Sequence, residues 1–162
     1  MKEEKAQPKA KTAEDMKSGQ GVFAVIRVRG SVDLKADVIR TLEQLRLDRA
    51  NHCVLVPKEP SFAGMLEKAK HYITWGEASK DMLERLIAKR GGTPGGKKPD
   101  RKEARKMAEI LVKKPAAGAK SMKPVFRLKP PSGGHKPIRK LYPRGALGYR
   151  GDKINELLKR MI

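Results

Sequence analysis

The sequence has little that a disulfide-linked, zinc-binding or membrane-spanning protein requires. It contains one cysteine, Cys53, so it can form no intrachain disulfide and no structural zinc site with several thiolate ligands. No segment approaches the roughly 20 consecutive apolar residues of a spanning helix. The N-terminus also lacks the apolar stretch of a secretory signal. We therefore expect a chain that suits a reducing compartment and has no membrane partner.

Acidic residues are scarce in the C-terminal part of the chain. The sequence has 38 Lys and Arg against 18 Asp and Glu, a formal net charge of +20. Residues 91–162 hold 20 of the basic residues and only 5 of the acidic ones, so they carry three quarters of the excess. Hydrophobic residues make up 38% of the chain, enough for a modest core. Such an uneven distribution of positive charge favours a polyanion as partner. Nucleic acid is the first candidate and an anionic membrane surface the second.

The hydrophobic pattern divides the chain into three regions. Residues 1–21 have no apolar period and predict a flexible charged tail. Residues 22–90 predict a core followed by a helix. Residues 91–162 predict a basic extension, partly helical and partly extended, that binds RNA. No repeat occurs at the spacing of a solenoid protein.

The core region alternates between strand and helix patterns. Three β-branched or aromatic runs predict strands, at residues 22–29, 53–56 and 71–75. Gly76 is expected to end the third. Between the strands, two amphipathic stretches predict helices that Ser31 and Ser61 could cap. We expect parallel neighbouring strands joined by right-handed crossovers, with both helices on one face of the sheet. The other face would need a cover or a partner.

Further elements follow the third strand. An apolar stripe predicts a helix that stops at Gly91, and residues 91–98 predict a flexible basic linker. The later elements are expected to be a helix opened by the capping-box pair Asp100 and Glu103, a strand at residues 125–128, and a last helix capped by Asp152.

No pattern in the sequence supports catalysis. Residues 91–98 approach the spacing of a P-loop, but Lys98 lacks the hydroxyl that Mg²⁺ requires and the segment follows a helix, not a strand. Cys53 opens an apolar strand and is predicted to be a small buried residue. A nuclease would need a carboxylate cluster or a metal site, and the basic tail offers only Asp152 and Glu156, which are better explained as helix residues. We predict no catalytic residue, no metal site, no cofactor and no small-molecule substrate.

Residues 123–150 give the strongest indication of nucleic-acid binding. Prolines among the cations limit the unfolded ensemble, and glycines let the backbone approach a ligand closely. Tyr142 and Tyr149 could stack on splayed bases. We expect this segment to have too little buried area to fold alone, and therefore to become ordered on RNA. The candidate RNA-binding residues of the whole chain are Arg27, Arg29, Lys58, His71, Lys102, Arg105, Lys106, Arg127, Lys129, Lys136, Arg139, Lys140, Tyr142, Arg144, Tyr149, Arg150 and Lys153.

A family resemblance is carried by two parts of the sequence. The first is FAVIRVRGSVDLKADVIRTLEQLRLDRANHCVLVPKEPSFAGMLEKAKHYITWGE, and the second comprises FRLKPPSGG and GALGYRGDKINELLKRMI. The first resembles the core of the large-subunit ribosomal protein thirty family, and the second resembles its long archaeal and eukaryotic form. Together they cover roughly residues 22–162, in the family's order. The resemblance implies an α+β fold: a ferredoxin-like β-α-β-α-β core with additional helices and a basic C-terminal extension.

The same resemblance implies a function. A member of this family would be a structural constituent of the large ribosomal subunit, on the cytoplasmic ribosome, with no enzymatic activity. Its partners would be ribosomal RNA and neighbouring ribosomal proteins. The alternative is a free RNA-binding chaperone or regulatory protein, which would share the composition but have no fixed stoichiometry with ribosomes.

Overall fold

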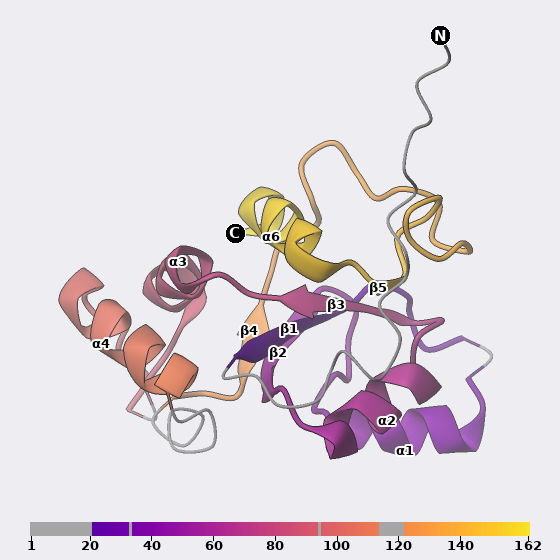
Figure 1. Ribbon diagram of the computed structural model, residues 1–162, viewed down its shortest axis with the longest axis horizontal. Coiled ribbons are helices and arrows are strands. Elements are labelled where there is room, and N and C mark those ends of the chain that lie inside the picture. Colours follow the sequence, from indigo (N-terminus) through magenta and orange to yellow (C-terminus); the bar gives the residue numbers. More distant parts are fainter. Residues whose placement is uncertain (1–20, 33, 94, 114–121) are drawn as a thin grey trace, which may run out of the picture.

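The computed structural model describes residues 21–32, 34–93, 95–113 and 122–162, and Figure 1 shows their arrangement. The first elements are β1 (Val22–Arg27), α1 (Ala36–Gln44), β2 (His52–Pro57), α2 (Pro60–Lys68), β3 (Ile73–Glu77) and α3 (Lys80–Arg90). They are followed by α4 (Arg101–Lys113), β4 (Val125–Arg127), β5 (Gly148–Tyr149), the 3-10 turn η2 (Gly151–Lys153) and α6 (Ile154–Met161). The predicted β-α-β-α-β order of the core is confirmed, whereas the predicted tail lies almost wholly outside the described residues.

The strands form one sheet in the order β4-β2-β1-β3-β5. β1 is antiparallel to both β2 and β3, β4 is antiparallel to β2, and β5 is parallel to β3. The prediction of parallel neighbours in the core is therefore wrong. β2 and β3 do run parallel to each other, but β1 lies between them. All six residues of β1 are buried, as expected for a central strand covered on both faces.

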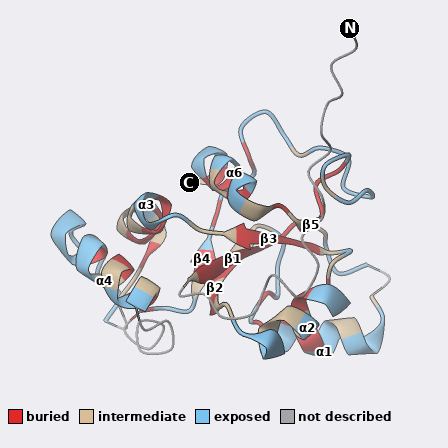
Figure 2. Cartoon of the chain, viewed as in Figure 1, coloured by how far each residue is buried: buried red, intermediate tan, exposed pale blue. Residues whose placement is uncertain are grey.

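Helices cover both faces of the sheet (Figure 2). Successive residues of β1 point to opposite faces, as in any strand. Phe23 and Val25 therefore pack with the buried residues of α1 and α2, while Ala24 and Ile26 pack with those of α3, α4 and α6. The prediction that two helices share one face is confirmed. The other face is covered by three helices that all follow β3 in the chain.

Three predicted helix caps are wrong. α1 begins at Ala36 after the N-cap Lys35, and the Ser31 hydroxyl instead accepts a hydrogen bond from Arg27 at 2.9 Å. α2 begins one residue before Ser61, at Pro60, a residue type whose fixed φ suits the first helical position. Asp152 lies within η2, ahead of α6. Within the expected capping box, the Asp100 amide donates to the Glu103 carboxylate at 3.2 Å.

Gly76 continues β3, which extends to Glu77, so the prediction that it ends the strand is also wrong. Its importance is steric. A Cβ atom at this position would lie 2.1 Å from the carbonyl oxygen of Gly151 and 2.9 Å from the Cβ of Ile154. Only glycine lets η2 and the start of α6 approach the sheet this closely.

The extension completes both edges of the sheet. β4 adds to β2, and β5 adds to β3, where the Arg150 amide donates to the carbonyl oxygen of Trp75 at 2.8 Å. Leu128, Ala146 and Leu147 are buried beside these strands. These residues give the cationic segment some buried area within the sheet, while its expected ordering on RNA stays a prediction. No helix among the described ranges is both long and apolar enough to cross a membrane.

Candidate nucleic-acid interface

The strand directions gather the basic loops at one end of the sheet. β1 and β4 finish at this end, and β2, β3 and β5 begin there. The described loop residues that meet there are 28–32, 34–35, 45–51, 69–72 and 128–147. Asp33 and Asp48 are the only acidic residues in the sequences of these four loops. We call this group of loops the basic end of the sheet.

A hollow of about 810 Å³ adjoins the basic end, between the extension loop and α6. Five of the residues around it are cationic and one is acidic. We call it the basic hollow, and its lining is Ser132, Lys136, Tyr142, Arg150, Lys153, Glu156, Leu157, Lys159 and Arg160. Its volume is large enough to admit a phosphate with its attached sugar.

The amphipathic pattern of α6 makes one wall of the basic hollow. Ile154, Leu157, Leu158 and Met161 are buried against the sheet, which leaves the basic positions of α6 facing solvent. Lys153 pairs with Glu156 at 2.8 Å, and this hydrogen bond raises the pKa of Lys153 and lowers that of Glu156.

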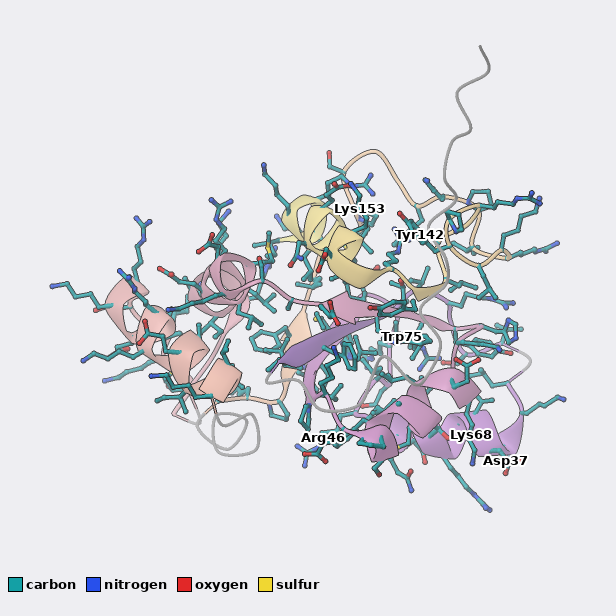
Figure 3. The ribbon with its side chains drawn as sticks, in the orientation of Figure 1. Asp37, Arg46, Lys68, Trp75, Tyr142 and Lys153 are labelled. Carbon is teal, nitrogen blue, oxygen red and sulfur yellow. The ribbon has the colours of Figure 1, made fainter. Side chains whose placement is uncertain are left out.

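The extension loop makes the opposite wall. The Arg160 guanidinium donates to the Ser132 carbonyl at 3.2 Å, and the Ser132 amide donates to the Arg160 carbonyl at 3.1 Å, so the loop is fastened to the end of α6. Lys136 donates to the Pro143 carbonyl at 3.3 Å, and its ammonium nitrogen lies 5.8 Å from the centroid of the Tyr142 ring. Figure 3 shows Tyr142 on this loop and Lys153 at the end of η2, directly before α6.

Arg150 forms the floor of the basic hollow and holds the loop to the sheet. Its guanidinium donates to the Thr74 hydroxyl at 2.9 Å and to the Ala146 carbonyl at 2.8 Å. The Thr74 hydroxyl in turn donates to the Gly148 carbonyl at 2.9 Å. Burial lowers the pKa of Arg150, and the guanidinium carbon lies 5.3 Å from the Tyr142 ring centroid. This network explains how a Gly- and Pro-rich loop keeps one shape.

Comparison with known proteins decides the family. The family described as ribosomal protein L30p/L7e matches residues 23–73. The chain is 43% identical over 152 residues to the large ribosomal subunit protein uL30 of Methanococcus maripaludis, covering 86% of this chain and 99% of that one. It is 40% identical over 153 residues to uL30 of Methanosphaera stadtmanae, covering 87% of this chain and all of that one. The chain belongs to the uL30 family. The resemblance to the long form is thus confirmed over nearly the full length of these archaeal relatives.

The chain does not expose every arginine that the sequence suggested as an RNA contact. Arg27 and Arg150 are buried, with 2% and 9% of their surfaces exposed. Arg27 donates to the carbonyls of Leu47 at 2.6 Å and Asp48 at 2.8 Å, which fastens the loop before β2. Burial lowers the pKa of Arg27 as well. Both guanidinium groups bind protein acceptors, so neither is an exposed cation, and RNA contact by Arg27 and Arg150 stays an untested prediction.

Two further candidates are used inside the protein. Lys58 lies at the opposite end of the sheet, where it pairs with Glu77 at 2.7 Å. The half-buried Tyr149 ring packs against Trp75, with ring centroids 6.3 Å apart. Neither side chain lies within the loops of the basic end, so the structure does not bring these two together with the other candidates.

The largest set of candidates does gather at the basic end of the sheet. Arg29 lies 5.0 Å from the centroid of Tyr72 and donates to the His71 carbonyl at 3.4 Å, so these two candidates are adjacent. The others at this end are the exposed residues Arg127, Lys129, Lys136, Arg139, Lys140 and Arg144, together with the half-exposed Tyr142. Lys153 joins them across the basic hollow.

The candidates on α4 form a separate basic surface. Lys102, Arg105 and Lys106 are exposed, and Figure 1 shows α4 beside α3, far from the extension loop. Glu109 on the same helix binds Lys80 at 2.9 Å and lies 3.9 Å from Arg105. The α4 surface is therefore partly neutralised, unlike the basic end.

Sequence reasoning missed Lys159 and Arg160, which line the basic hollow. The signal was present, because the apolar stripe of α6 fixes its polar face and places these residues two turns after Lys153. It also missed Arg49, which acts on His52 together with Arg127, since nothing in the sequence places the loop before β2 beside β4.

The one cysteine of the chain is inaccessible. Cys53 is fully buried, as predicted, and burial raises the pKa of its thiol to about 12. A thiol with this pKa is a poor nucleophile at neutral pH. Within the described ranges, no group of three or more His, Cys, Asp or Glu side chains is placed to hold a metal ion.

Proposed function

We propose that this chain is a structural constituent of the large ribosomal subunit and binds ribosomal RNA through the basic end of the sheet and the basic hollow. Membership of the uL30 family supports the first part. The convergence at one end of the sheet of four loops whose described charged residues are all basic except Asp48 supports the second. The chain's role is structural, not enzymatic, and its partners are ribosomal RNA and neighbouring ribosomal proteins.

The chemistry of the interface is phosphate neutralisation. Each Lys or Arg that contacts a phosphate releases condensed counterions, so RNA affinity should fall steeply as salt rises. The basic end offers the exposed cations Arg139, Lys140 and Arg144 on one loop. Within the described loops of that end, Asp48 is the only carboxylate that would oppose a phosphate.

The basic hollow can accommodate one nucleotide of RNA backbone where the strand leaves an RNA double helix. Lys136, Lys159 and Arg160 surround it with positive charge, and the face of Tyr142 offers a surface for a base. Lys136 is exposed and flexible, so its ammonium can move from the Tyr142 ring to a phosphate. We therefore propose that phosphate contacts dominate over most of the interface and that base stacking is confined to this hollow.

Charge reversal tests the proposed interface. Arg139→Glu, Lys140→Glu and Arg144→Glu combined should abolish most incorporation into large subunits, because they replace phosphate attraction with repulsion. The matched control combines Lys68→Glu, Arg85→Glu and Lys89→Glu, which makes the same change of charge on exposed positions of α2 and α3. Incorporation is measured by mass spectrometry of purified subunits. Equal incorporation of the two triple variants would show that the basic end is not the interface.

The same measurement separates the proposal from a free RNA chaperone or regulatory protein. A subunit constituent is recovered with the large subunit at fixed stoichiometry. A chaperone would bind RNA in general and be recovered in the free fraction whichever triple variant is used.

A further inference from the structure

A row of three lysines runs along the outer face of α4. With 3.6 residues per turn, Lys102, Lys106 and Lys113 fall within about 40° of one another, opposite the apolar residues that α4 buries. All three lysines are exposed, and they extend over about 16 Å of the helix. Figure 3 shows nitrogen-tipped side chains projecting from α4 away from the rest of the chain. We call this row the lysine stripe.

The two carboxylates of α4 are engaged at other positions. Glu109 binds Lys80 of α3 at 2.9 Å and lies 3.9 Å from Arg105. Glu103 accepts a hydrogen bond from the Asp100 amide at 3.2 Å, at the start of the helix. Among the described residues, no lysine of the stripe forms an ion pair. Three neighbouring positive charges therefore face solvent, and a polyanion is the partner that such a field favours.

α4 is held in a fixed place, away from the basic end of the sheet. Its buried residues belong to the same core cluster as Leu83 and Leu86 of α3. The Arg90 guanidinium, at the end of α3, donates to the Ile162 carbonyl after α6 at 3.1 Å. Figure 1 shows α4 at the left end of the longest axis and the extension loop at the right. The two basic surfaces therefore face different surroundings, and an RNA segment held at one of them leaves the other open.

The composition of α4 discriminates among polyanions. The helix contains no aromatic residue, so it lacks the stacking platform that single-stranded RNA commonly uses. Its apolar side packs in the core, so that side is not free to enter a membrane surface. An RNA double helix needs neither feature, because it is recognised by shape and by phosphate contacts across its wide, shallow minor groove. Ile110, which is 46% exposed on α4, can pack on ribose in such a groove.

We propose that the lysine stripe binds the backbone of an RNA double helix and that the chain bridges two separate segments of RNA. The basic end of the sheet and the basic hollow bind the first segment, and α4 binds the second. The inference rests on the proposed function for the first contact only. Because packed helices connect the two surfaces, the chain fixes the two RNA segments relative to each other, which neither surface can do alone.

A bridging assay tests this inference. A short biotinylated RNA duplex is immobilised, full-length protein is added with a fluorescent duplex of another sequence, and the captured fluorescence is measured. With the wild type, capture should rise and then fall as protein is added, because excess protein occupies each duplex separately.

Three double variants of equal charge change make the assay specific. Lys102→Glu with Lys106→Glu should reduce capture about tenfold or more, because it replaces phosphate attraction with repulsion on α4. Arg139→Glu with Lys140→Glu should reduce capture as much, from the other surface. The control, Arg40→Glu with Lys68→Glu on exposed positions of α1 and α2, should bridge like the wild type. Thermal unfolding of each variant verifies that it is folded.

The second surface is refuted if the wild type captures no fluorescent duplex, or if the α4 variant captures as much as the control. It is also refuted if the α4 variant loses affinity for an oligoglutamate peptide but not for the duplex, which would assign α4 to an acidic protein segment. Gel-shift binding of large-subunit ribosomal RNA to the same proteins separates this inference from the proposed function. A wild type that does not bind this RNA refutes the function, whereas intact binding without capture refutes only the bridge.

Discussion

Replacing Arg150 should loosen the extension without removing a phosphate contact. Arg150→Met leaves the Ala146 carbonyl and the Thr74 hydroxyl without the donors that now lie 2.8 and 2.9 Å away. An orphaned buried acceptor costs about 1–3 kcal/mol, and removing a buried charge returns part of that loss. We therefore expect the free energy of unfolding to fall by about 2–4 kcal/mol. For a chain of this length, that lowers Tm by roughly 5–10 °C.

Two variants and two assays make this prediction sharp. Arg150→Lys keeps the charge, but a lysine lacks the planar guanidinium and cannot donate to both acceptors at once. It should therefore lose about half as much stability as Arg150→Met. Hydrogen exchange should accelerate at the amides of Tyr142 and Gly145, which donate within the loop to Leu147 and Leu141. RNA affinity should fall for Arg150→Met, yet the slope of affinity against salt should not change. Lys140→Gln, in contrast, should reduce that slope by about 1.

The reasoning fails if the free energy of unfolding of Arg150→Met lies within about 0.5 kcal/mol of that of the wild type, a difference typical of surface substitutions. It fails equally if Arg150→Met lowers the salt slope as much as Lys140→Gln does. In that case Arg150 would be a phosphate contact and the guanidinium would have to leave its buried position on RNA.

Three other changes probe the fold and its pH dependence. Gly76→Ala should cost more than about 3 kcal/mol in chemical denaturation, because the new Cβ would overlap the Gly151 carbonyl; a smaller loss means that η2 can shift away. Cys53 should resist thiol reagents at pH 8 until the chain unfolds, and rapid labelling of the native protein would contradict this. The stability that comes from burying its neutral thiol should be complete below pH 9.0 and should be lost as pH rises toward about 12. Burial, with Arg150 and Arg160 nearby, lowers the pKa of His135 from 6.5, so stability should decline as pH falls below 6.5, and His135→Gln should flatten that decline in urea titrations at several pH values.

The sequence was most informative where each element's own pattern decides its structure. The apolar runs of β1 and β2 and the stripe of α6 predicted strands and a helix that the structure contains, because burial on one side leaves a period in the sequence. Strand order leaves no such trace. An apolar run such as residues 22–27 specifies that it is buried, but it does not specify which strands flank it or in which direction they run.

The candidate interface was predictable in composition but not in detail. A surplus of cations after residue 91 predicted a polyanion partner for the extension. The sequence could not show that Arg27 binds carbonyls of a loop some 20 residues later, or that Arg150 turns back to the Ala146 carbonyl, since buried and exposed arginines look alike in a sequence. Nor could it show that Arg49 lies at the end of the sheet where β4 finishes, because that depends on strand direction.

The most direct test of the central claim is sedimentation of ribosomes through sucrose gradients over a series of salt concentrations, with the chain quantified in each fraction. An integral constituent should be found at one copy per large subunit and should remain after a high-salt wash. Recovery of the protein at the top of the gradient, or its release by modest salt together with general RNA binding, would contradict a structural role in the large subunit.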